Sequence, residues 1–224
     1  MAAPQLHAPE LEWVRPPRQA RSHLTLGRIL DATEGLLAEK RWEDASVAEI
    51  AKRAGSSVGA FYARFRDKDA LLSALHERFV EEARATADFA MSEERWAKAS
   101  ICEIVRELVA FQVRIQDQRS GLLRAIALRA TESPAFQARG LSIARHIEEL
   151  FTRLVVARRH EILHPIPVLA AAFASRLIHG VMLQRLLFPA GAAVDVPGAS
   201  LVEELTHAAL AYLGVFPEDA IDAY

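Results

Sequence analysis

The stretch "AGSSVGAFYARFRDKDALL", residues Ala54–Leu72, decides the fold of the front part of this chain. Gly55 fits the left-handed position that ends a helix, and a second short helix is expected from about Ser57 to Phe65. Before it, Ser46 and Glu49 have the spacing of a capping box, which predicts the start of another short helix. Two short helices joined by a glycine turn predict a helix-turn-helix at about residues 46–65.

A cap and apolar spacing also predict the helices before and after the helix-turn-helix. Asp67 is a plausible N-cap for a fourth helix, which would bury apolar residues from Leu71 to Phe79. A first helix is predicted by apolar residues at helical spacing, which form one buried stripe of Leu26, Ile29, Leu30, Thr33, Leu36 and Leu37.

In helix-turn-helix units the second helix enters the major groove, and its first residues meet base edges. Small residues there let the backbone approach the groove floor: Ser57, Val58, Gly59 and Ala60. Phe61 and Phe65 would face inward and fix the angle of the helix, whereas Tyr62, Arg64 and Lys68 would point outward to phosphates. The competing interpretation is an ordinary helical hairpin whose glycines serve only as turns, and for Arg64 a solvated surface arginine.

The segment from about Arg21 to Leu75 resembles the TetR family of bacterial transcriptional repressors. Its elements occur in register. Trp42 and Ser46 precede the first short helix of the predicted helix-turn-helix, and then come "IAKRAG", "GAFY", an aromatic at Phe65 and "DKDALL". The resemblance implies that Ser46, Tyr62 and Lys68 contact the DNA backbone and that residues 57–60 occupy the base-reading positions. Arg21, with Arg15 and Arg18, could add a basic arm, although a solubilising tail explains these arginines equally well.

This segment departs from the family pattern at Val58, Ala63 and Arg64. Val58 stands where relatives often carry a polar or basic residue, and it can meet a thymine methyl but cannot make a bidentate hydrogen bond. Base readout is therefore expected to rest on Ser57, Ala60 and DNA shape.

The rest of the chain is also predicted to be helical. No proline falls between Arg18 and Ser133, and no convincing strand pattern is present. Helices are expected at about 95–117, 121–131, 135–160, 167–188 and 200–213, the last with a capping box at Ser200 and a stop at Gly214. The prediction is an all-α protein with a disordered arm (1–20), a three-helix DNA-binding domain (21–75), and a larger helical effector-binding and dimerisation domain (76–224).

Composition narrows the class of protein. The net charge of the 224 residues is −2, but residues 15–78 carry 12 Lys and Arg against 9 Asp and Glu. Any contact with a polyanion is therefore expected in this N-terminal part. Cys102 is the only cysteine, which excludes an intrachain disulfide and a thiolate metal cluster. The N-terminal region lacks a signal-peptide pattern, and Arg176, His179 and Arg185 interrupt the most apolar stretch. We therefore expect a cytoplasmic protein without a membrane span.

"HEILH", residues 160–164, matches the zinc-hydrolase motif H-E-x-x-H, which needs both histidines on one continuous helix. Pro165 disfavours helical geometry at His164, and no acidic residue follows between Pro165 and Val194. A solvated helix end is the better interpretation. No catalytic site, metal site or cofactor is predicted.

The resemblance implies a homodimer in which the last two long helices, about 167–188 and 200–213, form a four-helix bundle, and small residues on both helices agree with close packing. A monomer that buries these faces is the alternative. The resemblance also implies a small-molecule effector, with Arg176 as the strongest candidate contact. The other candidate pocket residues are Phe111, Arg114, Leu128, His146, Leu150, Phe173 and His179. The function that follows is a ligand-released repressor on a palindromic DNA operator; a helical interaction module without DNA binding is the other class.

Overall fold

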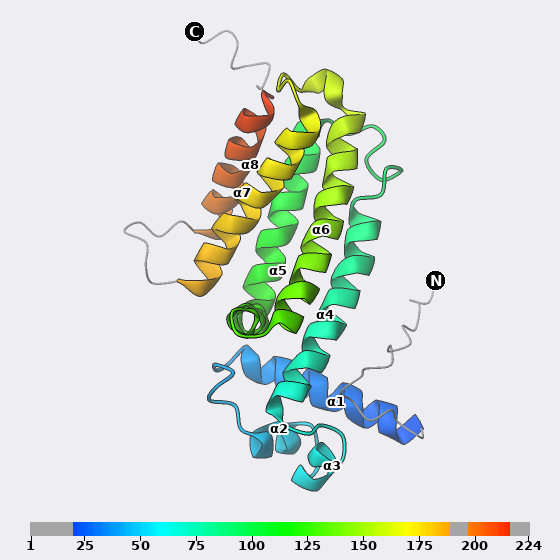
Figure 1. Ribbon diagram of the computed structural model, residues 1–224, viewed down its shortest axis with the longest axis vertical. Coiled ribbons are helices and arrows are strands. Elements are labelled where there is room, and N and C mark those ends of the chain that lie inside the picture. Colours follow the sequence, from blue (N-terminus) through cyan, green and yellow to red (C-terminus); the bar gives the residue numbers. More distant parts are fainter. Residues whose placement is uncertain (1–19, 189–196, 216–224) are drawn as a thin grey trace. The chain divides into compact units, whose positions relative to one another are not determined.

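The computed structural model describes residues 20–188 and 197–215, and the side chains of residues 20–24 lie outside the description. The predicted arm therefore falls almost wholly outside the described residues. Within them the fold is all-α, as predicted, with no strand. The helices are α1 (Ala20–Leu37), α2 (Val47–Arg53), α3 (Val58–Tyr62), α4 (Lys68–Ala90), α5 (Ile101–Ala130), α6 (Pro134–Ala157), α7 (Pro167–Leu187) and α8 (Gly198–Leu213), with a 3-10 turn at Arg159–Glu161 (Figure 1).

The chain divides into two compact units that do not follow the sequence in one cut. The first comprises residues 1–82 and 121–139, and the second residues 83–120 and 140–224. The end of α5 and the start of α6 thus belong to the same unit as the predicted helix-turn-helix. The predicted boundary at residue 75 is a functional division, and it stays a prediction.

The core of the first unit is built by α1 to α4 together with the returning segment 121–139. The predicted stripe of α1 is buried, including Thr33, whose hydroxyl donates to the carbonyl of Ile29 at 2.6 Å. Leu122, Ala125 and Phe136 from the returning segment join this cluster. The first unit therefore needs residues from the middle of the chain to complete its core.

The second unit is a helical body with its own apolar core, drawn from α4 to α8. Helices α7 and α8 lie side by side in it (Figure 1). Helix α8 starts at Gly198 with Pro197 as N-cap and no side-chain cap bond, so the predicted capping box at Ser200 is wrong. It ends at Gly214, which has φ 73°, as predicted.

Helix α5 covers the two predicted helices 95–117 and 121–131, which meet at a kink. It is one element with non-helical dihedrals at Arg119 (φ −122°, ψ 23°), close to the predicted break. Its start is later than predicted, because Ser100 and Glu103 form a capping box: Glu103 Oε2 accepts from the Ser100 amide at 2.8 Å.

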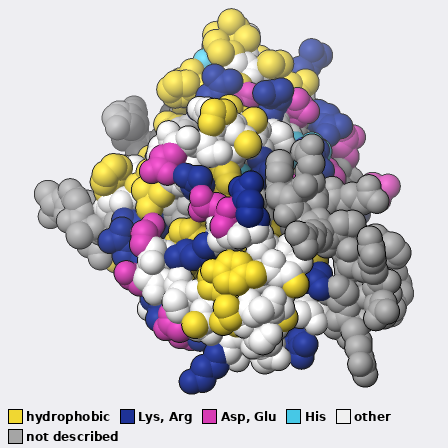
Figure 2. Space-filling view, turned by 60° about the horizontal axis from the view of Figure 1, so that its bottom comes forward, with side chains coloured by type: hydrophobic (Ala, Val, Ile, Leu, Met, Phe, Trp, Pro, Cys, Tyr) yellow, Lys and Arg dark blue, Asp and Glu magenta, His cyan; other side chains and the backbone are white. Residues whose placement is uncertain are grey.

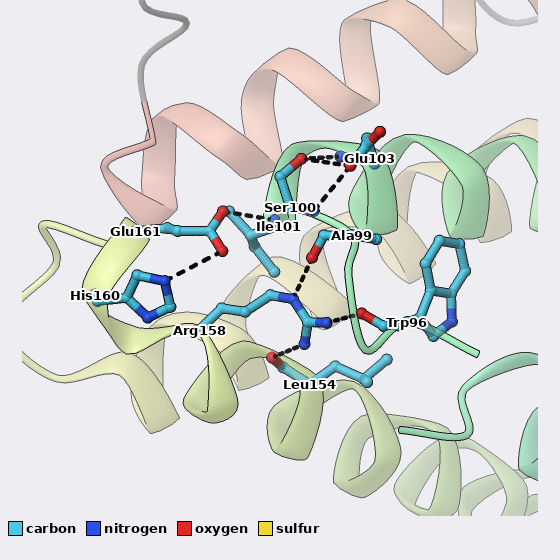
Figure 3. Close-up of polar contacts among 9 residues, drawn as sticks. All are labelled: Trp96, Ala99, Ser100, Ile101, Glu103, Leu154, Arg158, His160 and Glu161. Atoms are coloured by element: carbon cyan, nitrogen blue, oxygen red, sulfur yellow. Dashed lines mark hydrogen bonds and ion pairs between the residues drawn. The ribbon is translucent and has the colours of Figure 1, made fainter. Parts of the chain in front are cut away.

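A buried arginine holds the irregular segment before α5 in place by hydrogen bonds. Arg158 is 8% exposed, and its guanidinium donates to the carbonyls of Ala99 (2.7 Å), Leu154 (3.2 Å) and Trp96 (Figure 3). Glu161 adds a further tie by accepting from the Ile101 amide at 2.8 Å. The turn at 92–100 is therefore fixed to the end of α6.

Among the described residues, one helix, α7, is long and apolar enough to cross a membrane by those two criteria. It also carries Arg176 and Arg185, which form ion pairs with Glu148 (3.1 Å) and Asp117 (2.7 Å). Many of its apolar side chains are exposed in the single chain.

Candidate DNA-binding interface

The capping box that starts α2 fixes the first end of the helix-turn-helix. Ser46 Oγ accepts from the Glu49 amide at 3.2 Å, and Glu49 Oε2 accepts from the Ser46 amide at 3.0 Å, as predicted. Lys40 Nζ lies 2.7 Å from Glu49 Oε1. These hydrogen bonds, that from Lys40 first, lower the pKa of Glu49 to about 2. The cap is thus formed throughout the neutral range.

The turn between the two short helices has the predicted left-handed glycine. Gly55 has φ 60°, a conformation that costs a residue with a Cβ atom more than it costs glycine. Ser57 then caps α3, because its hydroxyl accepts from the Ala60 amide at 3.0 Å. Each helix of the motif therefore begins at a serine cap.

Helix α3 has two faces with different tasks. Phe61 and Phe65 are fully buried, with ring centroids 5.3 Å apart. On the other face Val58 is 42% and Tyr62 54% exposed. Gly59 is also exposed, and a Cβ atom there would meet nothing closer than Ser57 Oγ at 3.8 Å. The buried rings fix the helix, and its first turn offers small, uncharged groups to a partner.

The basic residues near the helix-turn-helix differ from one another in exposure and in partners, whereas the prediction has Arg64 and Lys68 both pointing outward. Arg64 is half-buried, and burial lowers the pKa of its guanidinium. Arg66 is exposed and pairs with Asp67 at 2.7 Å. Arg21 lies in the first turn of α1, with its side chain outside the described residues. Figure 2 shows basic side chains spread around a hydrophobic group on this face.

Lys68 does not point outward as predicted. Its ammonium donates to the backbone carbonyls of Trp42 (2.5 Å), Ala45 (2.7 Å) and Glu43 (3.3 Å). It also lies 4.5 Å from the centre of the Trp42 ring. The spacing of the sequence could not show this contact, because the carbonyls belong to a turn more than twenty residues earlier.

The predicted effector residues belong to both units. Leu128 lies in the first unit, and the other seven lie in the second. Arg176, the strongest predicted contact, has a side chain that is 73% exposed and pairs with Glu148. His179 and Arg114 are also exposed, and Arg114 lies 5.9 Å from the Phe111 ring.

Three of these residues have well-defined surroundings. Leu150 belongs to the apolar core of the second unit. His146 Nε2 lies 2.6 Å from Asp88 Oδ1. Phe173 is 48% exposed and packs against the ring of Tyr212 at 4.6 Å.

An open cavity of about 730 Å³ lies elsewhere in the second unit, and none of the eight predicted residues lines it. Its lining is mixed and polar: Glu93, Glu94, Ala97, Lys98, Ala99, Ser100, Ala157, Arg158, His160 and Glu161.

The geometry at "HEILH" agrees with the rejection of a zinc hydrolase. Helix α6 ends at Ala157, so His160 and His164 do not share one helix. His160 is exposed and its Nε2 lies 3.8 Å from Glu161 Oε1 (Figure 3), and His164 Nδ1 accepts from the Ile166 amide at 3.1 Å. In the described part of the chain no group of three or more His, Cys, Asp or Glu residues could hold a metal ion.

Comparison with known sequences adds independent evidence about the helix-turn-helix segment. Residues 29–75 match the family described as bacterial regulatory proteins of the tetR family. A segment of 53 residues is 38% identical to YvdT of Bacillus subtilis strain 168, an HTH-type transcriptional regulator, and covers 24% of this chain and 27% of that protein. The chain thus aligns with only about a quarter of that relative.

Comparison with solved structures extends the likeness to most of the chain. A proposed TetR-family regulator from Mesorhizobium loti has a TM-score of 0.67 at 19% identity over 88% of this chain and 98% of its own. NalD, the secondary repressor of the MexAB-OprM multidrug efflux pump in Pseudomonas aeruginosa, has a TM-score of 0.61 at 22% identity over 87% and 98%. Residues 29–75, with their serine-capped helix-turn-helix, thus match the tetR family of bacterial regulatory proteins, and the chain shares the fold of these solved structures.

Proposed function

We propose that this protein is a transcriptional repressor that binds a palindromic DNA operator as a homodimer and leaves it when a small molecule binds the second unit. The exposed face of α3 carries the proposal. Val58, Gly59 and Tyr62 lie in solvent while Phe61 anchors the helix from behind. A rigid short helix with small residues at its start suits close approach to the floor of a major groove.

Phosphate contacts would hold this helix in register. The Ser46 and Tyr62 hydroxyls can bond phosphate oxygens, and Ser57, Val58, Gly59 and Ala60 would face the bases. Few of these groups can read bases by paired hydrogen bonds, so we expect sequence preference to depend on thymine methyl contacts and DNA shape. Acting on DNA, the protein would work in the cytoplasm.

A homodimer explains the exposed apolar side chains of α7. Val168, Leu169 and Phe173 are each about half exposed in the single chain. An exposed apolar strip of this kind marks a protein interface in a soluble protein. Pairing α7 and α8 with the same helices of a second copy would cover it in a four-helix bundle. Two recognition helices about 34 Å apart could then read both halves of a palindrome.

Release by an effector requires that the ligand prefer one spacing of the two recognition helices. Moving a mostly bound population to mostly free requires a preference of several kcal/mol. The proposed contacts are aromatic and polar side chains of the second unit: Phe111, Arg114, His146, Phe173, Arg176 and His179. Leu150 completes the proposed set within the second unit, whose apolar core it joins.

The test is binding of the full chain to the DNA upstream of its own coding region, because such regulators commonly control adjacent transcription units. We expect one discrete complex in a mobility-shift experiment that survives an excess of random DNA. Compounds that dissolve the complex identify the effector class. Equal affinity for upstream and random DNA of the same length contradicts an operator-binding repressor, and an absence of any complex favours a helical interaction module.

A further inference from the structure

The helix-turn-helix is joined to the rest of its unit through two irregular segments. The turn between α1 and α2 precedes Ser46, and the link between α3 and α4 follows Phe65. The first has only turn-type backbone bonds, such as Ala45 N to the Trp42 carbonyl at 3.3 Å. Buried rings hold α3 from behind, but the position of Ser46 at the start of α2 depends on what holds the first segment.

Lys68, the first residue of α4, connects the two segments. Its ammonium donates to the carbonyls of Trp42 and Ala45 at 2.5 and 2.7 Å, and to that of Glu43 at 3.3 Å. An ammonium has three N–H donors, so each has one acceptor within the protein. Nothing is left on this side chain for a phosphate while the turn is in place.

The surroundings favour a structural cation. The Trp42 ring covers the ammonium at 4.5 Å, and the side chain is partly buried. Burial lowers the pKa of Lys68, while the carboxylates of Glu43, Asp69 and Asp44 act in the opposite direction. At the same place Asp67 caps α4 by accepting from the Ala70 amide at 2.7 Å. Both ends of the helix-turn-helix thus meet at residues 67–68.

We propose that Lys68 is a positioning residue of the DNA-binding site, which ties the turn at residues 42–45 to the start of α4 and thereby orients Ser46, without contacting DNA itself. This inference rests on the proposed function for its effect on DNA binding. Its effect on the turn is independent of DNA.

The experiment compares Lys68→Met, which removes all donors and the charge, with Lys68→Gln, which keeps two N–H donors without the charge. Lys98→Met is the control, because Lys98 is an exposed lysine of the second unit. For each protein the thermal unfolding midpoint, the amide exchange of Glu49, and the affinity for upstream DNA over a series of salt concentrations are measured.

We expect Lys68→Met to lower the midpoint, speed exchange at Glu49 and weaken binding to all sequences, with Lys68→Gln recovering part of each loss. The slope of log affinity against log salt should stay unchanged, because no phosphate contact is lost. A phosphate ligand would instead reduce the slope by about 0.9 for each protomer. That reduction, with an unchanged midpoint, would overturn the proposal.

Two further outcomes are decisive. If wild type binds no DNA, the proposed function fails, and Glu49 exchange alone decides: faster exchange supports the tie, and unchanged exchange contradicts it. If Lys68→Met does not fold, the slope of log affinity against log salt is measured on Lys68→Gln instead. Equal loss in both variants with a smaller slope would show that the charge acts on DNA.

Discussion

Lys68 and Arg158 do the same work in the two units. Each is a cation, buried for Arg158 and partly buried for Lys68, that donates to three backbone carbonyls at or near a turn. Carbonyls at such places have no partner in a helix ladder, and leaving them buried and unbonded costs free energy. Long basic side chains solve the problem because their stems reach across apolar surface.

His76 is a buried titratable group of the first unit, 1% exposed and stacked on Phe136 with ring centroids 5.0 Å apart. Its burial, with the nearby guanidinium of Arg139, lowers its pKa to about 4. The unfolded chain therefore takes up this proton near pH 6.5, whereas the folded chain stays neutral until about pH 4.

Stability should consequently fall as the pH drops through that window. We expect wild type to lose about 2 kcal/mol of unfolding free energy between pH 7 and pH 5 relative to His76→Gln, as measured by urea denaturation. An NMR titration of His76 near its ordinary pKa, or parallel pH curves for the two proteins, would refute this origin of acid sensitivity.

At the scale of elements, α5 shows how a single glycine permits close packing. A Cβ atom at Gly121 would lie 1.8 Å from the carbonyl oxygen of Leu37, at the end of α1. Backbone cannot give way as a flexible side chain can, so glycine is required here. The contact lies just after the non-helical residue Arg119, where α5 passes from one unit to the other.

Gly121→Ala should therefore lower the unfolding free energy by about 1–3 kcal/mol, even though alanine is the better helix former. Gly140→Ala is the matched control: its new Cβ meets nothing within 4 Å in α6, and it should gain up to about 1 kcal/mol. Both values come from denaturant unfolding. A gain of stability for both variants would show that the α1–α5 contact is looser than described.

Most helices could be predicted from local signals. The stripe of α1, the Ser46 cap and the left-handed Gly55 each depend on residues within a few positions, and all were confirmed. The late start of α5 was also readable, because Ser100 and Glu103 repeat the capping-box spacing. The Ser200 box failed because the same spacing occurs inside a helix that had already begun.

Contacts between distant segments could not be predicted in this way. Lys68 meets a turn far back in the chain, and Gly121 meets the end of α1. Arg176 has apolar neighbours in the sequence, yet its side chain is 73% exposed. Helix α7, however, has apolar residues on more than one face, so its pattern gives no direction for a single side chain.

At the scale of the whole molecule, the proposed dimer is testable at the exposed face of α7. Leu169→Glu places a charge in the proposed interface, and Leu141→Glu is the control on α6, because the two leucines are 54% and 55% exposed. In sedimentation we expect wild type and Leu141→Glu to be dimers and Leu169→Glu to shift toward monomers, since an unpaired charge in an interface is costly. Dimers of equal strength in all three would place the interface elsewhere.

The proposed function requires that α3 present its first turn to DNA, and the variant Gly59→Glu tests this requirement. The position has room for a side chain, so the variant should fold, but the new carboxylate would face phosphates and base edges. Gly140→Glu makes the same charge change in the open space on α6. In fluorescence-anisotropy titrations with the upstream DNA, we predict wild-type affinity for Gly140→Glu and a loss of at least about 100-fold for Gly59→Glu, with no loss of thermal stability in either variant. Binding of folded Gly59→Glu within about threefold of wild type would contradict this placement of α3 on DNA. A tenfold change in affinity corresponds to only about 1.4 kcal/mol, so a smaller change would mean that the new charge meets almost no repelling charge.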